Sequence, residues 1–173
     1  MKSIIVKSFI TILEYFFRLI PSNFFKAFEK ITIIWTTAYW KRRFSKCGHN
    51  VVIRPKITVY EPGKVCVGDY VSFGEGVHIY GNGGVNIGNY VMIGHYSTLT
   101  TATHDYKVSL MYDTFLTSPI VIKDNVWIGA NCIILSGVII ESGCVVGAGS
   151  VVTHSVSENQ IVAGNPARMI KNR

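Results

Sequence analysis

The sequence predicts a mainly β protein, a parallel solenoid of about five triangular coils that follows an N-terminal helical segment. From Cys47 onward, an aliphatic residue recurs every six positions and is often followed by glycine. These hexads fall into groups of three, and extra residues occur between groups and never within them. The segment Val59–Val71 is also repeated twenty residues later as Ile79–Val91, with its tyrosines and glycines kept and Val or Ile at each valine position.

Residues 1–46 are predicted to form a basic and apolar segment that is mainly helical. Apolar residues over 2–20 have helical spacing, Pro21 interrupts them, and Ser22 is suited to cap a second helix. The segment holds nine Lys and Arg and two acidic residues, a net charge of +7, whereas the remainder holds eight of each sign. We therefore expect peripheral contact with an anionic membrane surface, or else packing on its own domain or a sister subunit.

Composition argues against several classes of protein. The basic residues are interleaved with Ile, Leu and Phe, which favours lipid over nucleic acid as the partner. Lys7, Glu14 and Arg18 interrupt the first apolar stretch, so neither a signal peptide nor a transmembrane helix is expected. The four cysteines show no Cys-x-x-Cys pairing and are expected to be reduced thiols. These features predict a cytoplasmic protein, working at the inner face of the membrane.

Residues 47–157 are predicted to form the solenoid domain. In each hexad the aliphatic residue and the small or β-branched residue four positions later point inward, and Gly, Asn and Asp turn the chain. Steps between equivalent positions are six within a group, and 8, 8, 23 and 6 between groups. Insertions along one edge are what a triangular solenoid predicts. The longest insertion predicts a protruding loop over 105–118, directly after His104, and loops of that length are often functional.

Three motifs extend the pattern into the C-terminal half: Val126–Ala130, Val146–Val152 and Val162–Arg168. With the hexads, they resemble the hexapeptide-repeat acetyltransferases over roughly residues 50–171, in particular the maltose, galactoside and polysaccharide O-acetyltransferases. The resemblance implies a left-handed parallel β-helix, a homotrimer with active sites between subunits, and acetyl-coenzyme A as donor. It also implies that the tail, residues 158–173, completes the coenzyme site.

The resemblance implies that His104 is catalytic, since Thr103-His104 matches a Thr-His motif at a coil corner in that group. A neutral imidazole suits the role of general base toward a sugar hydroxyl or amine, with direct transfer in a ternary complex. The amide of Ala130 is the implied oxyanion donor. Glu75 lies near the position where relatives carry an acceptor-binding Asn, and Asp105 adjoins the base. Both are expected to contact the acceptor, and Asp105 is also considered as the group that orients His104.

Further positions match those that bind the coenzyme in the group. The pantetheine arm is implied to run along late coils, and its phosphates are implied to meet cations after the Asn-Pro pair. Where relatives have Thr-Lys, this chain has Thr153-His154. The coenzyme contacts implied by the resemblance are Trp127, Gly129, Ala130, Gly147, Ala148, Thr153, His154, Arg168 and Lys171.

The expected function is acetyl transfer to a sugar in the biosynthesis of a polysaccharide, an O-antigen or a capsule, without a metal. A competing hypothesis is a zinc enzyme of the γ-carbonic-anhydrase type on the same fold, which needs three converging histidines. His78 and His95 occupy different positions of their hexads, so they do not stack. The motifs are also compatible with an acetyltransferase of the serine or xenobiotic type. A non-catalytic scaffold is a third hypothesis, although it would leave the His104 corner unexplained.

Overall fold

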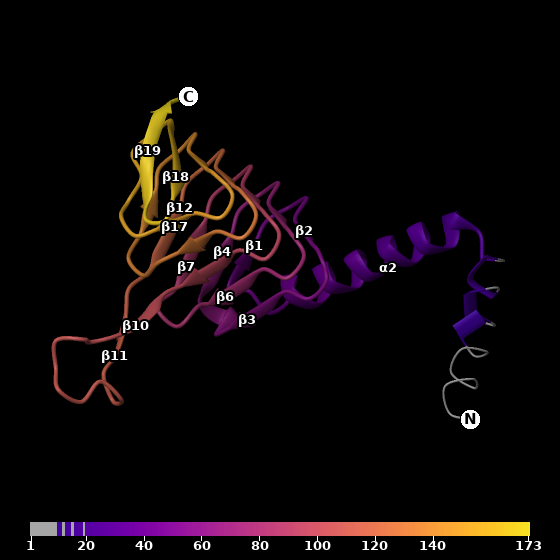
Figure 1. Cartoon of the computed structure of the whole chain (residues 1–173), viewed down its shortest axis with the longest axis horizontal. Coiled ribbons are helices and arrows are strands. Elements are labelled where there is room, and N and C mark those ends of the chain that lie inside the picture. The colour runs from indigo at the N-terminus through magenta and orange to yellow at the C-terminus, as the bar shows by residue number, and fades with distance from the viewer. Residues whose placement is uncertain (1–9, 12, 15, 19) are drawn as a thin grey trace. The chain divides into compact units, whose positions relative to one another are not determined.

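The computed structural model describes residues 10, 11, 13, 14, 16–18 and 20–173 (Figure 1). The helix expected over residues 2–20 is present at the described positions from 10 to 18, and residues 2–9, 12, 15 and 19 lie outside the described residues. The chain divides into two compact units, Met1–Thr32 and Ile33–Arg173.

Helix α2 (Ser22–Lys41) begins at the serine that the sequence suggested as a cap and continues through the β-branched run at 31–37. Its last turns are tied to the first coil, which explains why the weak helical propensity of this run is overridden. The Thr37 hydroxyl accepts a hydrogen bond of 2.9 Å from the Ile53 amide. Phe44, just beyond the helix, is buried between the rings of Trp40 and Phe73. The apolar end of the solenoid is therefore covered.

Three parallel sheets, here called faces 1, 2 and 3, build five stacked triangular coils. Face 1 contains β1 (Lys46–Cys47), β4 (Val65–Val67), β7 (Val85–Ile87), β12 (Ile120–Ile122) and β15 (Ile139–Ile140). Face 2 contains β2 (Val52–Ile53), β5 (Ser72–Phe73), β8 (Met92–Ile93), β13 (Trp127–Ile128), β16 (Val145–Val146) and β18 (Gln160–Gly164). Face 3 contains β3 (Thr58–Tyr60), β6 (His78–Tyr80), β9 (Thr98–Thr100), β14 (Ile133–Ile134) and β17 (Val151–Val152).

The core follows the hexad positions predicted from the sequence. Both inward columns are buried after the partly buried Cys47, including the small positions Ser97, Cys132 and Ser150. The buried hydroxyls are satisfied, since the Ser97 hydroxyl donates to the Gly129 carbonyl at 2.9 Å and that of Ser150 to the Gly147 carbonyl. The prediction of a left-handed parallel β-helix with about five triangular coils is confirmed.

All insertions lie at the third corner, between face 3 of one coil and face 1 of the next. The short helix η1 (Pro62–Lys64) occupies the first insertion. The longest forms an antiparallel hairpin of β10 (Ala102–His104) and β11 (Phe115–Thr117), which projects from the coils (Figure 1). This hairpin, residues 102–117, is called the arm below. The expected loop after His104 is thus the distal part of the arm, and His104 itself lies on a strand.

The base of the arm is fixed to the solenoid by buried Thr101. Its amide and hydroxyl both donate to the Tyr80 carbonyl, at 3.1 and 2.5 Å, and its hydroxyl accepts from the Gly83 amide at 2.8 Å. Beyond the fifth coil, β18 pairs with the antiparallel strand β19 (Ala167–Asn172), which ends face 2. The arm and the C-terminal hairpin are the two structures added to the regular coils.

Candidate active site

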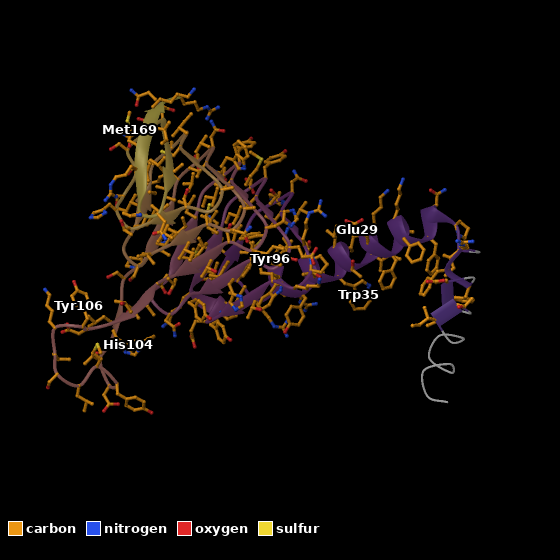
Figure 2. All side chains as sticks on the ribbon, viewed as in Figure 1. Glu29, Trp35, Tyr96, His104, Tyr106 and Met169 are labelled. Carbon is orange, nitrogen blue, oxygen red and sulfur yellow. The ribbon has the colours of Figure 1, made fainter. Side chains whose placement is uncertain are left out.

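His104 lies on β10 opposite Phe115 of β11, and the two rings meet edge to face with centroids 6.1 Å apart. Figure 2 shows His104 on the arm, away from the coils. Its Nδ1 lies 3.2 Å from the Met111 carbonyl oxygen. A carbonyl oxygen is an acceptor, so in this contact Nδ1 carries the hydrogen and Nε2 of the neutral ring carries the lone pair. The side chain is exposed. The arm therefore presents a histidine that is oriented by a backbone group and has a nitrogen able to accept a proton.

Asp105, the residue that the sequence suggested as an orienting group, serves the arm instead. Its carboxylate Oδ1 accepts a hydrogen bond of 2.9 Å from the Lys107 amide. Its own amide donates to the carbonyl and the hydroxyl of Thr114, at 3.2 and 3.0 Å. The orienting role falls to Met111, which sequence reasoning missed because a carbonyl carries no side-chain signature.

The second corner, between faces 2 and 3, brings together four of the residues expected near the thioester: Gly129, Ala130, Gly147 and Ala148. The coils approach closely there, since a Cβ on Gly129 would lie 2.6 Å from the Ala148 nitrogen. The Ala130 carbonyl accepts from the Gly149 amide at 2.8 Å, and its own amide donates to no other described residue. That amide is free to bind a developing negative charge.

Glu75 lies on the same corner, two coils before Ala130, with His95 between them. Its amide donates to His95 Nδ1 at 3.0 Å, and its carboxylate lies 2.6 Å from the Lys56 ammonium. The hydrogen bond and charge of Lys56 lower the pKa of Glu75. The carboxylate is therefore negative at neutral pH and shared with a cation.

Trp127 lies on the outward side of face 2, beside Met92 in the strand register, and 52% of it is exposed. It helps line a pocket of about 300 Å³ together with Arg54 and His95. An exposed indole beside the Gly129–Ala130 corner offers an apolar wall for an extended ligand. This position suits the expected role in coenzyme binding.

The C-terminal residues expected near the coenzyme phosphates lie beyond face 3 and on β19. Thr153 Oγ1 is 2.8 Å from His154 Nδ1, and His154 lines a second pocket of about 290 Å³ that also includes Arg168. Lys171 is exposed on β19, opposite Ile161. His154 and Arg168 thus line one pocket, and Lys171 lies on the same strand as Arg168, so an anionic group would be attracted to this part of the chain.

The predicted site is divided within one chain. His104 belongs to the third corner, whereas Glu75, Ala130 and Ala148 belong to the second, and face 3 lies between the two corners. The imidazole and the Ala130 amide therefore lie at different corners of one chain.

A cysteine nucleophile or a cluster of metal ligands would provide other kinds of chemistry. Burial raises the pKa of the Cys132 and Cys144 thiols, so both are protonated and poorly nucleophilic at neutral pH. In the part of the chain that the structure describes, no three His, Cys, Asp or Glu side chains form a group able to hold a metal ion. His104 is thus the group whose geometry suits proton transfer.

The chain is similar to known acetyltransferases. Residues 119–154 match the family model described as bacterial transferase hexapeptide, six repeats. The chain is 38% identical over 129 residues to WcaF of Escherichia coli K12, named as an acetyltransferase of colanic acid biosynthesis, and the match covers 75% of this chain and 70% of WcaF. It is 34% identical over 140 residues to a galactoside O-acetyltransferase of Lactococcus lactis, covering 77% of this chain and 65% of that protein.

A solved structure agrees with these matches. The hexapeptide-repeat acetyltransferase of Vibrio cholerae in complex with acetyl-coenzyme A superposes with a TM-score of 0.74. The two chains are 32% identical, and the alignment covers 78% of this chain and 74% of the other.

Proposed function

This chain belongs to the hexapeptide-repeat acetyltransferases, which use acetyl-coenzyme A, and we propose that it acetylates a hydroxyl or amino group of a sugar during polysaccharide, O-antigen or capsule biosynthesis. The observation that carries the proposal is His104 on the arm, with Nδ1 bonded to the Met111 carbonyl and Nε2 exposed. The names of WcaF and of the galactoside O-acetyltransferase support a sugar as the acceptor.

The proposed reaction is a direct transfer in a ternary complex. Acetyl-coenzyme A supplies an acetyl group activated as a thioester. His104 Nε2 accepts the proton of the acceptor hydroxyl or amine as that group attacks the thioester carbonyl. The Ala130 amide donates a hydrogen bond to the oxygen that becomes negative. The imidazolium then returns its proton to the sulfur as the carbon–sulfur bond breaks, so no residue is acetylated.

We propose that the active site forms between neighbouring subunits of a homotrimer. Each subunit would contribute the arm with His104 to one site and the second corner with Ala130 to another. This arrangement is supported by the separation of the two corners within one chain. A head-to-tail ring of three gives three equivalent sites of this kind.

The remaining predicted residues keep their proposed roles. Glu75, with its partner Lys56, and Asp105 at the arm are proposed acceptor contacts. Trp127 and the second corner are proposed to hold the pantetheine arm. The residues proposed to hold the phosphate end are Thr153, His154, Arg168 and Lys171, and the pocket that His154 and Arg168 both line supports this assignment.

We also propose that residues 1–46 attach the enzyme to the inner, anionic face of the cytoplasmic membrane. Exposed Phe24, Phe28, Ile31 and Trp35 recur at helical spacing along α2, and Lys26 and Lys30 lie among them. No described helix is both long and apolar enough to traverse a bilayer. If flotation with anionic vesicles is the same for the full chain and for a chain with these four residues changed to Gln, this proposal is wrong.

The function is tested by release of free thiol from acetyl-coenzyme A in the presence of a panel of sugars. Replacing a general base should lower kcat by about 10²–10⁴-fold, so we expect that loss for His104→Ala. His49→Ala is the matched control, because His49 is exposed at the first corner, away from the arm. Equal rates for wild type and His104→Ala would show that His104 is not the base.

A further inference from the structure

The outward side of face 3 changes its chemistry at the arm. In the first three coils, the outward positions of β3, β6 and β9 carry rings and hydroxyls and no charge: Thr58, Tyr60, His78, Tyr80, Thr98 and Thr100. In the last two coils, the outward residues of β14 and β17 are the aliphatic Ile133 and Val151. The arm leaves the solenoid between these two regions, after β9.

Three rings on the first region form a continuous stack. Tyr60 and Tyr80 are paired in the strand register, and their rings lie parallel with centroids 5.0 Å apart and planes 10° apart. The ring of His78 stacks beside both, at 5.4 Å from Tyr80 and 6.3 Å from Tyr60. Half of Tyr60 and 38% of Tyr80 remain exposed. Large exposed aromatic surfaces of this kind commonly mark binding sites.

The stack is joined to the strand that carries His104. The Tyr80 carbonyl accepts two hydrogen bonds from Thr101, at the base of the arm. His104 follows three residues later, and an extended strand rises about 3.3 Å per residue, so the Cα atom of His104 lies roughly 10 Å from that of Thr101. Thr100 pairs with Tyr80 and continues the column of Tyr60 and Tyr80 toward the arm.

We propose that the surface formed by Tyr60, His78, Tyr80, Thr98 and Thr100, here called the ring platform, binds the neutral sugar residues that flank the acetylated one. This inference rests on the proposed function, because it takes the sugar acceptor at His104 as given. Sugar rings combine apolar C–H faces with hydroxyl groups, and the platform matches both with aromatic faces and hydroxyls. The enzyme would therefore prefer an oligosaccharide over a free monosaccharide.

A second tyrosine stack provides an internal control. Tyr70 and Tyr90 stack in nearly the same geometry, with centroids 5.0 Å apart and planes 9° apart, but they lie at the first corner. Stacking between coils stabilises both tyrosine pairs, so a tyrosine stack alone does not indicate a ligand-binding site. The ring platform differs in its neighbouring hydroxyls and in its connection to the arm.

Binding can be measured without knowledge of the natural acceptor. The full chain labelled with fluorotyrosine would be titrated with neutral tetrasaccharides of glucose, galactose, mannose and fucose, and each signal assigned by a Tyr→Phe change. We expect at least one tetrasaccharide to shift the fluorine signals of Tyr60 and Tyr80 while those of Tyr70 and Tyr90 stay fixed. If no tetrasaccharide does so, or if both stacks respond equally, the proposal is overturned.

Kinetics give the second readout, with the tetrasaccharide that binds and its monosaccharide as acceptors. An aromatic contact of typical strength corresponds to about 2- to 12-fold in binding, so Tyr60→Ala or Tyr80→Ala should raise KM for the tetrasaccharide by that factor. We expect kcat and the monosaccharide KM to be unchanged, and Tyr70→Ala to behave as wild type toward both acceptors.

Two further outcomes separate the proposals. If Tyr60→Ala or Tyr80→Ala dissociates the oligomer in light scattering, the face is a contact between copies and the ring platform is wrong. If the fluorine signals shift but wild type releases no thiol with any sugar, the proposed function fails while the binding surface stands.

Discussion

At the scale of single residues, the arrangement around His104 depends on the main chain. The Met111 carbonyl selects the tautomer, and the Phe115 ring limits the tilt of the imidazole from the other strand. The sequence identified His104 from its place at the widest insertion. It could not identify Met111, because the contact arises from the fold of the arm, seven residues away, and is independent of the methionine side chain.

Phe115 is predicted to position the base. Phe115→Ala removes the edge-to-face contact, so the imidazole samples unproductive orientations and kcat should fall about 10-fold. KM for acetyl-coenzyme A should stay the same, since the ring is assigned no contact with the coenzyme. Met111→Ala is the matched control, because it keeps the carbonyl, and we expect nearly wild-type kcat. Similar kcat values for the two variants would argue against a positioning role for Phe115.

The Lys56–Glu75 pair gives a prediction about pH. The pKa of Glu75 is lowered by the hydrogen bond and charge of Lys56, so the pair stabilises the fold above the ordinary carboxyl pKa. That contribution is lost as the pH falls through the lowered value. Carbon-13 NMR of the side-chain carboxyl should therefore show a higher pKa for Glu75 in Lys56→Met than in wild type. A lower or equal value in the variant would contradict the contact.

At the scale of elements, the period of six predicted the strands because every coil buries the same two columns. The antiparallel strands of the arm were not predicted, since they pack on no core and leave no burial pattern in the sequence. Helix α2 extends through its β-branched run because Thr37 and Trp40 contact the first coil. In both cases the deciding interactions lie outside the local sequence.

Gly129 is predicted to be required at the second corner. A Cβ there would lie 2.6 Å from the Ala148 nitrogen and 2.8 Å from its Cα, and backbone atoms of the next coil cannot easily move. Gly129→Ala should therefore lower the free energy of unfolding by about 1–3 kcal/mol, measured by urea denaturation. Gly63→Ala is the control, since a Cβ at Gly63 meets nothing within 4 Å. Equal stability of the two variants would mean that the coils are less tightly packed than described.

At the scale of the whole molecule, the solenoid places chemically different surfaces at different corners. The hexad positions place Ala130 at the second corner and His104 at the third, so the separation of the site can be read from the sequence once the period is known. The proposed contact between subunits cannot be read in this way, because contacts between copies leave no repeat of their own. The net charge of +7 on residues 1–46 points to a further contact, with an anionic surface.

The central claim is that each active site takes His104 from one subunit and Ala130 from its neighbour. It is tested most directly by mixing two inactive chains, His104→Ala and Ala130→Glu, the second of which places a carboxylate beside the developing negative charge. After denaturation and joint refolding at equal amounts, about a quarter of the interfaces in a head-to-tail ring would combine two intact halves. We predict that thiol release recovers to about a quarter of the wild-type rate, whereas each chain refolded alone stays inactive. A mixture as inactive as its parents would contradict a site shared between subunits.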